Sequence, residues 1–173
     1  MPNAITMLKS DHAMVKRLLR ELDGTTERAI KQREALVAQI EREIKMHSQL
    51  EEEVFYPAFK AKTENTDAED LFYEAAEEHH IVDMVLPALK AANPKSHEFS
   101  AKAKVLKDLI EHHIREEEGQ MFPKARTLFS DEQLRKLGDL MQARKADKVL
   151  PARVKTAKAT AIAKAMPQEL RER

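Results

Sequence analysis

Hydrophobic residues recur every three or four positions in four long segments of the chain, which is the period of an amphipathic helix. Short stretches rich in Gly, Thr, Asn, Asp, Ser or Pro separate these segments, and such stretches end helices. They lie at residues 24–26, 63–67, 93–96 and 130–131. The recurring apolar residues are Leu8, Val15, Leu18, Leu19 and Leu22; Leu36, Ile40, Ile44, Leu50 and Val54; Leu71, Phe72, Val82, Val85, Leu86 and Leu89; and Val105, Leu106, Leu109, Ile110 and Ile114. Four such helices with short connections predict an antiparallel, up-down four-helix bundle.

A fifth helix is predicted at residues 131–146, where Leu134, Leu137, Leu140 and Met141 share one face. Beyond it, residues 147–173 form a basic tail that is rich in Ala and Lys and that we expect to be solvated or disordered. From Arg144 to Arg173, nine Lys and Arg oppose three acidic residues, which leaves a net charge of about +6. A contact with nucleic acid or another acidic partner is the less favoured interpretation of this charge.

Composition supports an all-α protein and restricts its chemistry. There are three Gly and no Trp in 173 residues, aromatic residues make up 5%, and charged residues make up 35%. Cys is absent, so disulfides, thiolate zinc sites and iron–sulfur clusters are excluded, and a metal would need N and O ligands. No apolar run reaches the length of a membrane span, and residues 1–6 do not resemble a signal peptide. We therefore expect a cytoplasmic protein without membrane contact.

The chain contains an internal repeat. His47 and Glu51 lie ten and six residues before Pro57, and His113 and Glu117 lie ten and six residues before Pro123. His12 and His79 occupy matching places, 35 and 34 residues before those two histidines. The sequence therefore predicts two helical hairpins, residues 1–65 and 66–130, which together form the bundle.

The repeated His and Glu residues predict a buried metal site. In a helix, residues i and i+4 share a face, and the neighbours on the faces of His12, His47, His79 and His113 are apolar. Burying Glu51 and Glu117 as well would be costly unless a positive charge accompanied them, and neither Lys nor Arg lies on the same stripe. Two carboxylates bridging two metal ions, with two imidazoles on each ion, would satisfy all six groups and suit iron better than a closed zinc site.

This pattern, with Phe-Tyr-Pro and Met-Phe-Pro following the two glutamates, resembles the bacterial hemerythrin-like (HHE cation-binding) domains over about residues 4–126. The resemblance implies two iron ions joined by an oxo or hydroxo bridge, with a small molecule such as O2, H2O2 or NO as the partner. It also implies the ligands His12, His47, Glu51, His79, His113 and Glu117. Oxygen-carrying members use a fifth histidine, one turn from another in the third helix. Here those positions are Ala75 and Asp83, so reversible O2 carriage is the less favoured role.

Five more residues are candidates for contact with the ligands or for replacing one of them. His80 and His112 adjoin His79 and His113, and their helix faces are more polar, so we expect them beside the ligands or in solvent. Asp83 is an alternative ligand, although we expect it to face solvent. Tyr56 and Tyr73 could reach the metals as phenolates, although core packing is the favoured role for both.

Three functions fit the sequence. The first is a di-iron protein that binds or senses O2, peroxide or NO in oxidative or nitrosative stress. The second is a di-iron catalase or peroxidase that removes H2O2 or reactive nitrogen species, with no catalytic side chain apart from the metal ligands. The third is an iron-binding or helical interaction module without redox turnover. Manganese or zinc in place of iron, and the oligomeric state, are left open by the sequence.

Overall fold

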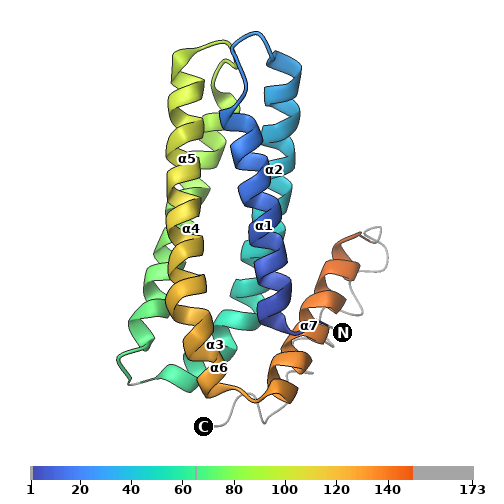
Figure 1. Ribbon diagram of the computed structural model, residues 1–173, viewed down its shortest axis with the longest axis vertical. Helices are drawn as coiled ribbons and strands as arrows, with labels where there is room; N and C mark the ends of the chain where they lie inside the picture. The colour runs from blue at the N-terminus through green and yellow to red at the C-terminus, as the bar shows by residue number, and fades with distance from the viewer. Residues whose placement is uncertain (1, 65, 150–173) are drawn as a thin grey trace.

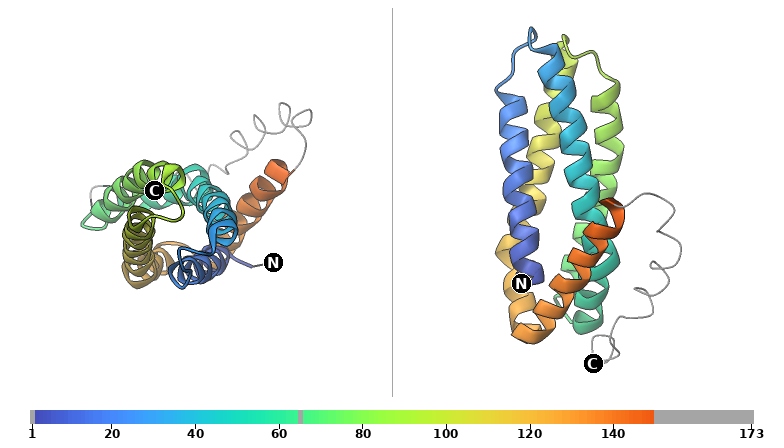
Figure 2. Two further views of the ribbon diagram at one scale, coloured as in Figure 1. Left: turned by 90° about the horizontal axis from the view of Figure 1, so that it is seen from above. Right: turned by 90° about the vertical axis from the view of Figure 1, so that its right-hand side faces the viewer.

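The computed structural model describes residues 2–64 and 66–149, and within these ranges the chain is helical and has no strand. The four long helices are α1 (Ala4–Asp23), α2 (Ile30–Leu50), α4 (Glu69–Ala91) and α5 (His97–Glu116). They run side by side along the long axis of the molecule, and both hairpin connections lie at the same end (Figure 1). Viewed along that axis, the four helices surround a shared interior (Figure 2). The all-α bundle predicted from the sequence is confirmed.

The second helix of each hairpin continues through a wider π-helical turn. α2 leads into η1 (Glu51–Phe55) and α3 (Tyr56–Thr63), and α5 leads into η2 (Glu117–Met121) and α6 (Phe122–Leu128). Pro57 and Pro123 explain the wide turns, because proline has no N–H to donate and its ring would clash with the carbonyl four residues earlier in a regular α-helix. The hydrogen bonds instead span five residues, with the Tyr56 N–H donating to the Glu51 carbonyl and the Phe122 N–H to the Glu117 carbonyl.

Helix α7 (Asp131–Val149) lies obliquely against one side of the bundle, where it packs on α1 and also contacts α2 and η1 (Figure 1). Ser130 and Gln133 cap its start reciprocally, since each side chain accepts from the other's backbone N–H. Gly138 lets α7 approach closely, because a Cβ there would lie 2.6 Å from the Pro2 carbonyl oxygen. The helix runs three residues beyond its predicted end, and residues 150–173 of the predicted basic tail lie outside the described residues.

Two apolar cores fill the bundle on either side of a polar layer. One core includes Leu8, Leu50 and Phe122 and reaches into α7, and the other includes Val15, Ile44 and Ile114 and reaches the hairpin connections. Both sets follow the helical period that the sequence shows. In the described part of the chain, no helix has the length and apolarity needed to cross a membrane.

Arg33 ties the two hairpins together at the connection end. It is buried, and its guanidinium donates to the Thr25 carbonyl and hydroxyl, to the Pro94 carbonyl at 2.6 Å, and to the Ser100 hydroxyl. The guanidinium also lies over the Phe99 ring, 5.0 Å from its centroid. One side chain of α2 therefore holds both hairpin connections, which fixes the relative positions of the four helices.

Candidate metal centre

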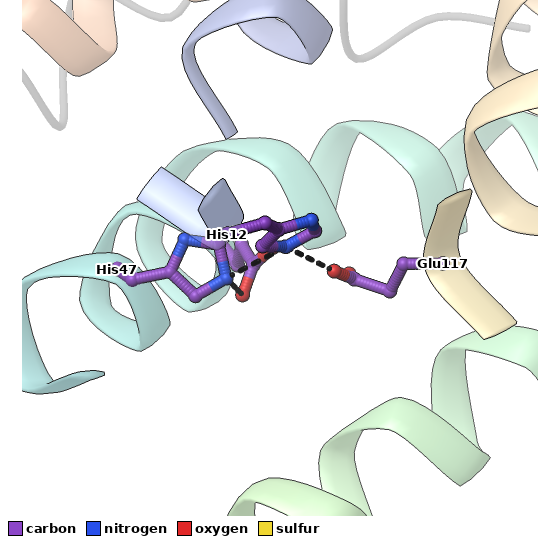
Figure 3. Close-up of side chains that lie close together, drawn as sticks. His12, His47 and Glu117 are labelled. Atoms are coloured by element: carbon purple, nitrogen blue, oxygen red, sulfur yellow. Dashed lines mark hydrogen bonds and ion pairs between the residues drawn. The ribbon is translucent and has the colours of Figure 1, made fainter. Parts of the chain in front are cut away.

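The polar layer between the two cores holds four histidines, one from each long helix. His12, His47, His79 and His113 are all buried, as their apolar neighbours predict. Within each hairpin the two imidazoles meet through Nε2, at 3.1 Å for His12 and His47 and at 3.3 Å for His79 and His113. Figure 3 shows His12 between the other two labelled residues, in contact with His47 on one side and with Glu117 on the other.

Glu51 and Glu117 lie between the two histidine pairs. Oε2 of Glu51 is 3.1 Å from Nε2 of His47 and 3.4 Å from Nε2 of His79. Oε2 of Glu117 is 3.1 Å from Nε2 of His12 and 3.5 Å from Nε2 of His113. Each glutamate therefore reaches both hairpins, which is the arrangement required of a carboxylate that bridges two ions. Both glutamates begin a π-helical turn, a feature that is frequent at functional sites.

The outer nitrogen of each imidazole faces an acidic residue. Nδ1 of His12 donates to Glu118 at 3.0 Å, and Nδ1 of His79 donates to Glu52 at 2.9 Å. Nδ1 of His113 donates to Glu78 at 2.8 Å. Nδ1 of His47 faces Asp11 at 3.9 Å, which is too far for a hydrogen bond. Because a carboxylate only accepts, these contacts place the proton on Nδ1 and leave the Nε2 lone pair for the interior.

These acidic partners follow the internal repeat, and sequence reasoning missed them. Asp11 and Glu78 each precede the histidine of the first helix in their hairpin and face the histidine of the second helix. Glu52 and Glu118 directly follow Glu51 and Glu117, and each pairs with a histidine of the opposite hairpin. The available signal was the recurrence of an acid directly before His12 and His79 and directly after Glu51 and Glu117.

The pKa shifts indicate that the four buried imidazoles and two buried carboxylates need added positive charge. Burial, followed by the nearby charge of Glu117, raises the pKa of Glu51 well above its usual range. Burial also opposes ionisation of Glu117, but the charges of His113 and His12 outweigh it and hold the pKa of Glu117 below its usual range. Burial lowers the pKa of His47 to about 4. In the absence of metal, protons on some of these groups must supply the missing positive charge.

The donor set fits bound metal. Both oxygens of Glu51 and Oε2 of Glu117 are buried and accept no hydrogen bond, although buried carboxylate oxygens normally do so. Ligand atoms of His12, His47, Glu51 and Glu117 lie within 4.8 Å of one another, as do those of Glu51, His79 and His113. Cations between these nitrogens and oxygens would satisfy the orphaned atoms and remove the repulsion between facing lone pairs. The buried His and Glu cluster is thus suited to bind metal.

Tyr56 is the one neighbouring candidate whose side chain enters the centre. Its buried hydroxyl donates to Oε1 of Glu117 at 2.9 Å and lies 3.4 Å from Nε2 of His79. Burial and the charges of Glu51 and Glu117 raise the pKa of Tyr56 well above its usual range, so the phenol keeps its proton at neutral pH. The matching residue of the second hairpin is Phe122, which stacks on His12 with 5.6 Å between ring centroids. At this position the two halves of the centre therefore differ by one hydroxyl group.

The other candidates lie outside the centre. His80 and Asp83 are exposed, and His112 is half-exposed beside Glu78 and Glu116. Tyr73 is half-exposed, with its ring against Phe72 and below the Lys60 ammonium, so the predicted core packing of Tyr73 is wrong. The error arises because Phe72 and Tyr73 lie on adjacent faces of α4, and only the face of Phe72 points inward.

A small cavity adjoins the four imidazoles, and neither Glu51 nor Glu117 lines it. Its volume is about 20 Å³, which is room for about one molecule the size of water. Apart from the histidines and Ser48, its lining is aliphatic: Val15, Ile44, Val82, Ile110 and Ile114. A small apolar molecule could therefore occupy this space in contact with the histidine side of the centre.

Comparisons with known proteins identify the family of this fold. The Hemerythrin HHE cation binding domain family matches residues 3–125. A solved structure of a Hemerythrin HHE cation binding domain-containing protein from Mycobacterium kansasii superposes with a TM-score of 0.73 and 26% identity, covering 96% of this chain and all of that one. A DNA nickase from Nostoc sp. is 28% identical over 131 residues, which are 76% of this chain but only 36% of the nickase. The chain therefore belongs to the hemerythrin HHE cation-binding domain family.

Proposed function

We propose that this protein holds two iron ions in the His and Glu centre and binds O2 or NO there, as part of a response to oxidative or nitrosative stress. The ligands would be His12 and His47 for one ion and His79 and His113 for the other, with Glu51 and Glu117 shared. When bound, iron would supply the Lewis acidity and electron-transfer chemistry that these side chains lack.

The observation that carries the proposal is the aliphatic cavity beside the four imidazoles. Its volume of about 20 Å³ excludes organic substrates, and its lining offers little to a polar ligand. A diatomic molecule meets both restrictions. The apolar lining would also exclude bulk water from the metals, which limits unwanted side reactions.

The protein side chains have distinct parts in this proposal. Glu51 and Glu117 would neutralise charge on the metals, and the acidic partners of the Nδ1 atoms would fix the imidazole rings. Neither residue at the two third-helix positions that could hold a fifth histidine can act as a ligand in its place, since Ala75 has no ligand atom and Asp83 faces solvent. Tyr56 would be the hydrogen-bond donor nearest to the His79 and His113 side.

One observation favours removal of H2O2 as a second candidate function. Cleavage of a peroxide bond needs a proton for the departing oxygen, and the Tyr56 hydroxyl is a protonated group beside the centre. The raised pKa of Tyr56 makes it a weak proton donor, so we rank this function below O2 or NO binding.

The test begins with metal-free protein reconstituted anaerobically with Fe²⁺. We expect about two iron ions per chain, and a stable change in the optical spectrum upon addition of O2 or NO. Chelation should lower the melting temperature, because a ligand at about 1,000 times its Kd adds roughly 4 kcal/mol of stability. Steady O2 evolution from H2O2 would favour the peroxide function instead. Fewer than about one ion per chain would exclude both functions.

A further inference from the structure

A second group of potential metal ligands lies on the outside of the bundle, next to the buried centre. Nε2 of His112 is 3.4 Å from Oε1 of Glu78 and 3.7 Å from Oε1 of Glu116. One ligand atom from each of the three residues lies within 4.8 Å of the others. The His112 side chain is 51% exposed, so solvent reaches this outer cluster, defined as Glu78, His112 and Glu116.

The outer cluster is connected to the buried centre in two ways. Glu78 belongs to both, because its Oε1 faces His112 while its Oε2 accepts from Nδ1 of His113 at 2.8 Å. A cavity of about 10 Å³ is also lined by residues of both, namely Glu78 and Glu116 of the outer cluster and Glu117 of the centre. Glu117 is buried, and its Oε2 accepts no hydrogen bond, so a residue that lines this cavity carries an acceptor without a donor.

The internal repeat provides a comparison within the same molecule. In the first hairpin, Met46 and Leu50 take the places of His112 and Glu116, so the ligand atoms are missing. Leu8 and Phe55 take the places of Ala75 and Met121, two residues that line this cavity, and both are fully buried. The first hairpin is therefore closed by larger apolar side chains at the matching position.

Helix α7 closes the first hairpin further. Asp11 is the counterpart of Glu78, and Lys145 of α7 binds both of its oxygens at 2.6 and 2.7 Å. An ammonium in that position occupies the carboxylate and repels cations. Glu78 has no such cation beside it among the described residues, and its neighbours are two histidines. The two outer faces of the centre thus differ in lining, charge and cover.

We propose that the outer cluster is the uptake site for the metal, which captures Fe²⁺ from solvent and passes it between α4 and α5 to the buried centre. Mixed imidazole and carboxylate ligands suit Fe²⁺, and three ligands with partial solvent exposure bind it weakly enough for release. The step is a ligand exchange without electron transfer, in which Glu78 and Glu116 give the ion up to Glu117. This inference rests on the proposed di-iron function.

The experiment compares rates of iron uptake. Metal-free protein is mixed anaerobically with limiting Fe²⁺, free ions are removed by gel filtration at set times, and bound iron is measured. The test variant is His112→Gln/Glu116→Gln, and a second variant is His112→Gln alone. The matched control, Glu77→Gln/His80→Gln, removes one Glu and one His from exposed positions of α4 outside the cluster.

We expect the double variant to take up iron about tenfold more slowly than the wild type, since a charged cleft can raise capture rates by that order. The single variant should be intermediate, the control should match the wild type, and all should end with the same iron content. Wild-type rates in the double variant would overturn the uptake route. A lower final iron content would also overturn it, because the cluster would then belong to the centre itself. If the wild type bound no iron, the proposed function would fail instead.

Discussion

The Tyr56 hydroxyl donates a hydrogen bond of 2.9 Å to Oε1 of Glu117, and this bond crosses from the first hairpin to the second. It depends on the π-helical turn that starts at Glu51. A wider turn brings Tyr56, five residues after Glu51, toward the interior face, where the phenol reaches the carboxylate of the opposite hairpin. The first hairpin thereby supplies a donor to Glu117 of the second.

Replacing Tyr56 with phenylalanine should destabilise the metal-free protein by about 1–3 kcal/mol, because a buried carboxylate loses its hydrogen-bond donor. With metal bound, the loss should be smaller, since the ions then hold Glu117. Chemical denaturation with and without metal measures both effects. The chain has one other tyrosine, so Tyr73→Phe is the matched control, and at its half-exposed position we expect a change within about 0.5 kcal/mol. Equal losses in the two variants would contradict a specific role for the Tyr56 hydroxyl.

Glu118 should control metal affinity without being a ligand. It accepts from Nδ1 of His12 at 3.0 Å and holds that ring with Nε2 inward. Glu118→Gln should weaken metal binding by about 10–100-fold, because an amide fixes the imidazole and its charge less well than a carboxylate. Competition against a chelator of known affinity measures the change. The exposed Glu77→Gln serves as the control, and an unchanged affinity in Glu118→Gln would show that the pairing with His12 is incidental.

Metal-free protein should lose stability as the pH rises above 6.5. Burial lowers the pKa of His12 and of His113, but contacts with Glu117 outweigh it and raise both above 6.5. A raised pKa in the folded state means that stability from these protons is full below 6.5 and is lost as the pH rises through the folded values. The raised pKa of Glu51 acts in the same direction. His47, with a pKa of about 4, acts in the opposite direction, but only near pH 6.5, where His47 of the unfolded chain still binds a proton.

Melting temperatures in the presence of a chelator, from pH 6.5 to about pH 8.5, test this trend. Metal affinity should change in the opposite direction, because His12 and His113 must lose protons before they can bind an ion. Metal binding in unbuffered solution should therefore release protons. A metal-free protein that grew more stable over the same pH range would contradict the assignment of protons to these groups.

Helical periodicity was sufficient to predict the bundle, since it reports which face of each helix is apolar. His12 and His47 lie on those faces, so their burial followed from Leu8, Val15, Ile44 and Leu50 around them. The π-helical turns were not predicted, because they shift the phase of a helix without altering its composition. Pro57 and Pro123 were visible, but a proline alone equally predicts a kink or an end.

The side-chain contacts between the two hairpins also could not be predicted from the sequence. The contact of Glu52 with His79 joins residues 27 positions apart on different helices, and helical spacing contains no information on how two helices are rotated against each other. The burial of Arg33 was not predicted either. A single arginine on an otherwise amphipathic helix normally faces solvent, yet here the hairpin connections fold over it and supply its acceptors.

Arg33→Met should destabilise the bundle by about 2–4 kcal/mol, because it removes the donor to the Pro94 and Thr25 carbonyls while the side chain stays apolar enough to remain buried. Arg33→Lys should recover little, since one ammonium cannot reproduce the planar fork that reaches both connections. Thermal or urea denaturation measures these losses, and Arg28→Met, at an exposed position before α2, is the control. Iron content should be unchanged in all three variants, because His47 lies 14 residues further along α2, or about 21 Å away. A loss of metal in Arg33→Met at temperatures where the bundle is still folded would instead show that the connection end and the centre are coupled.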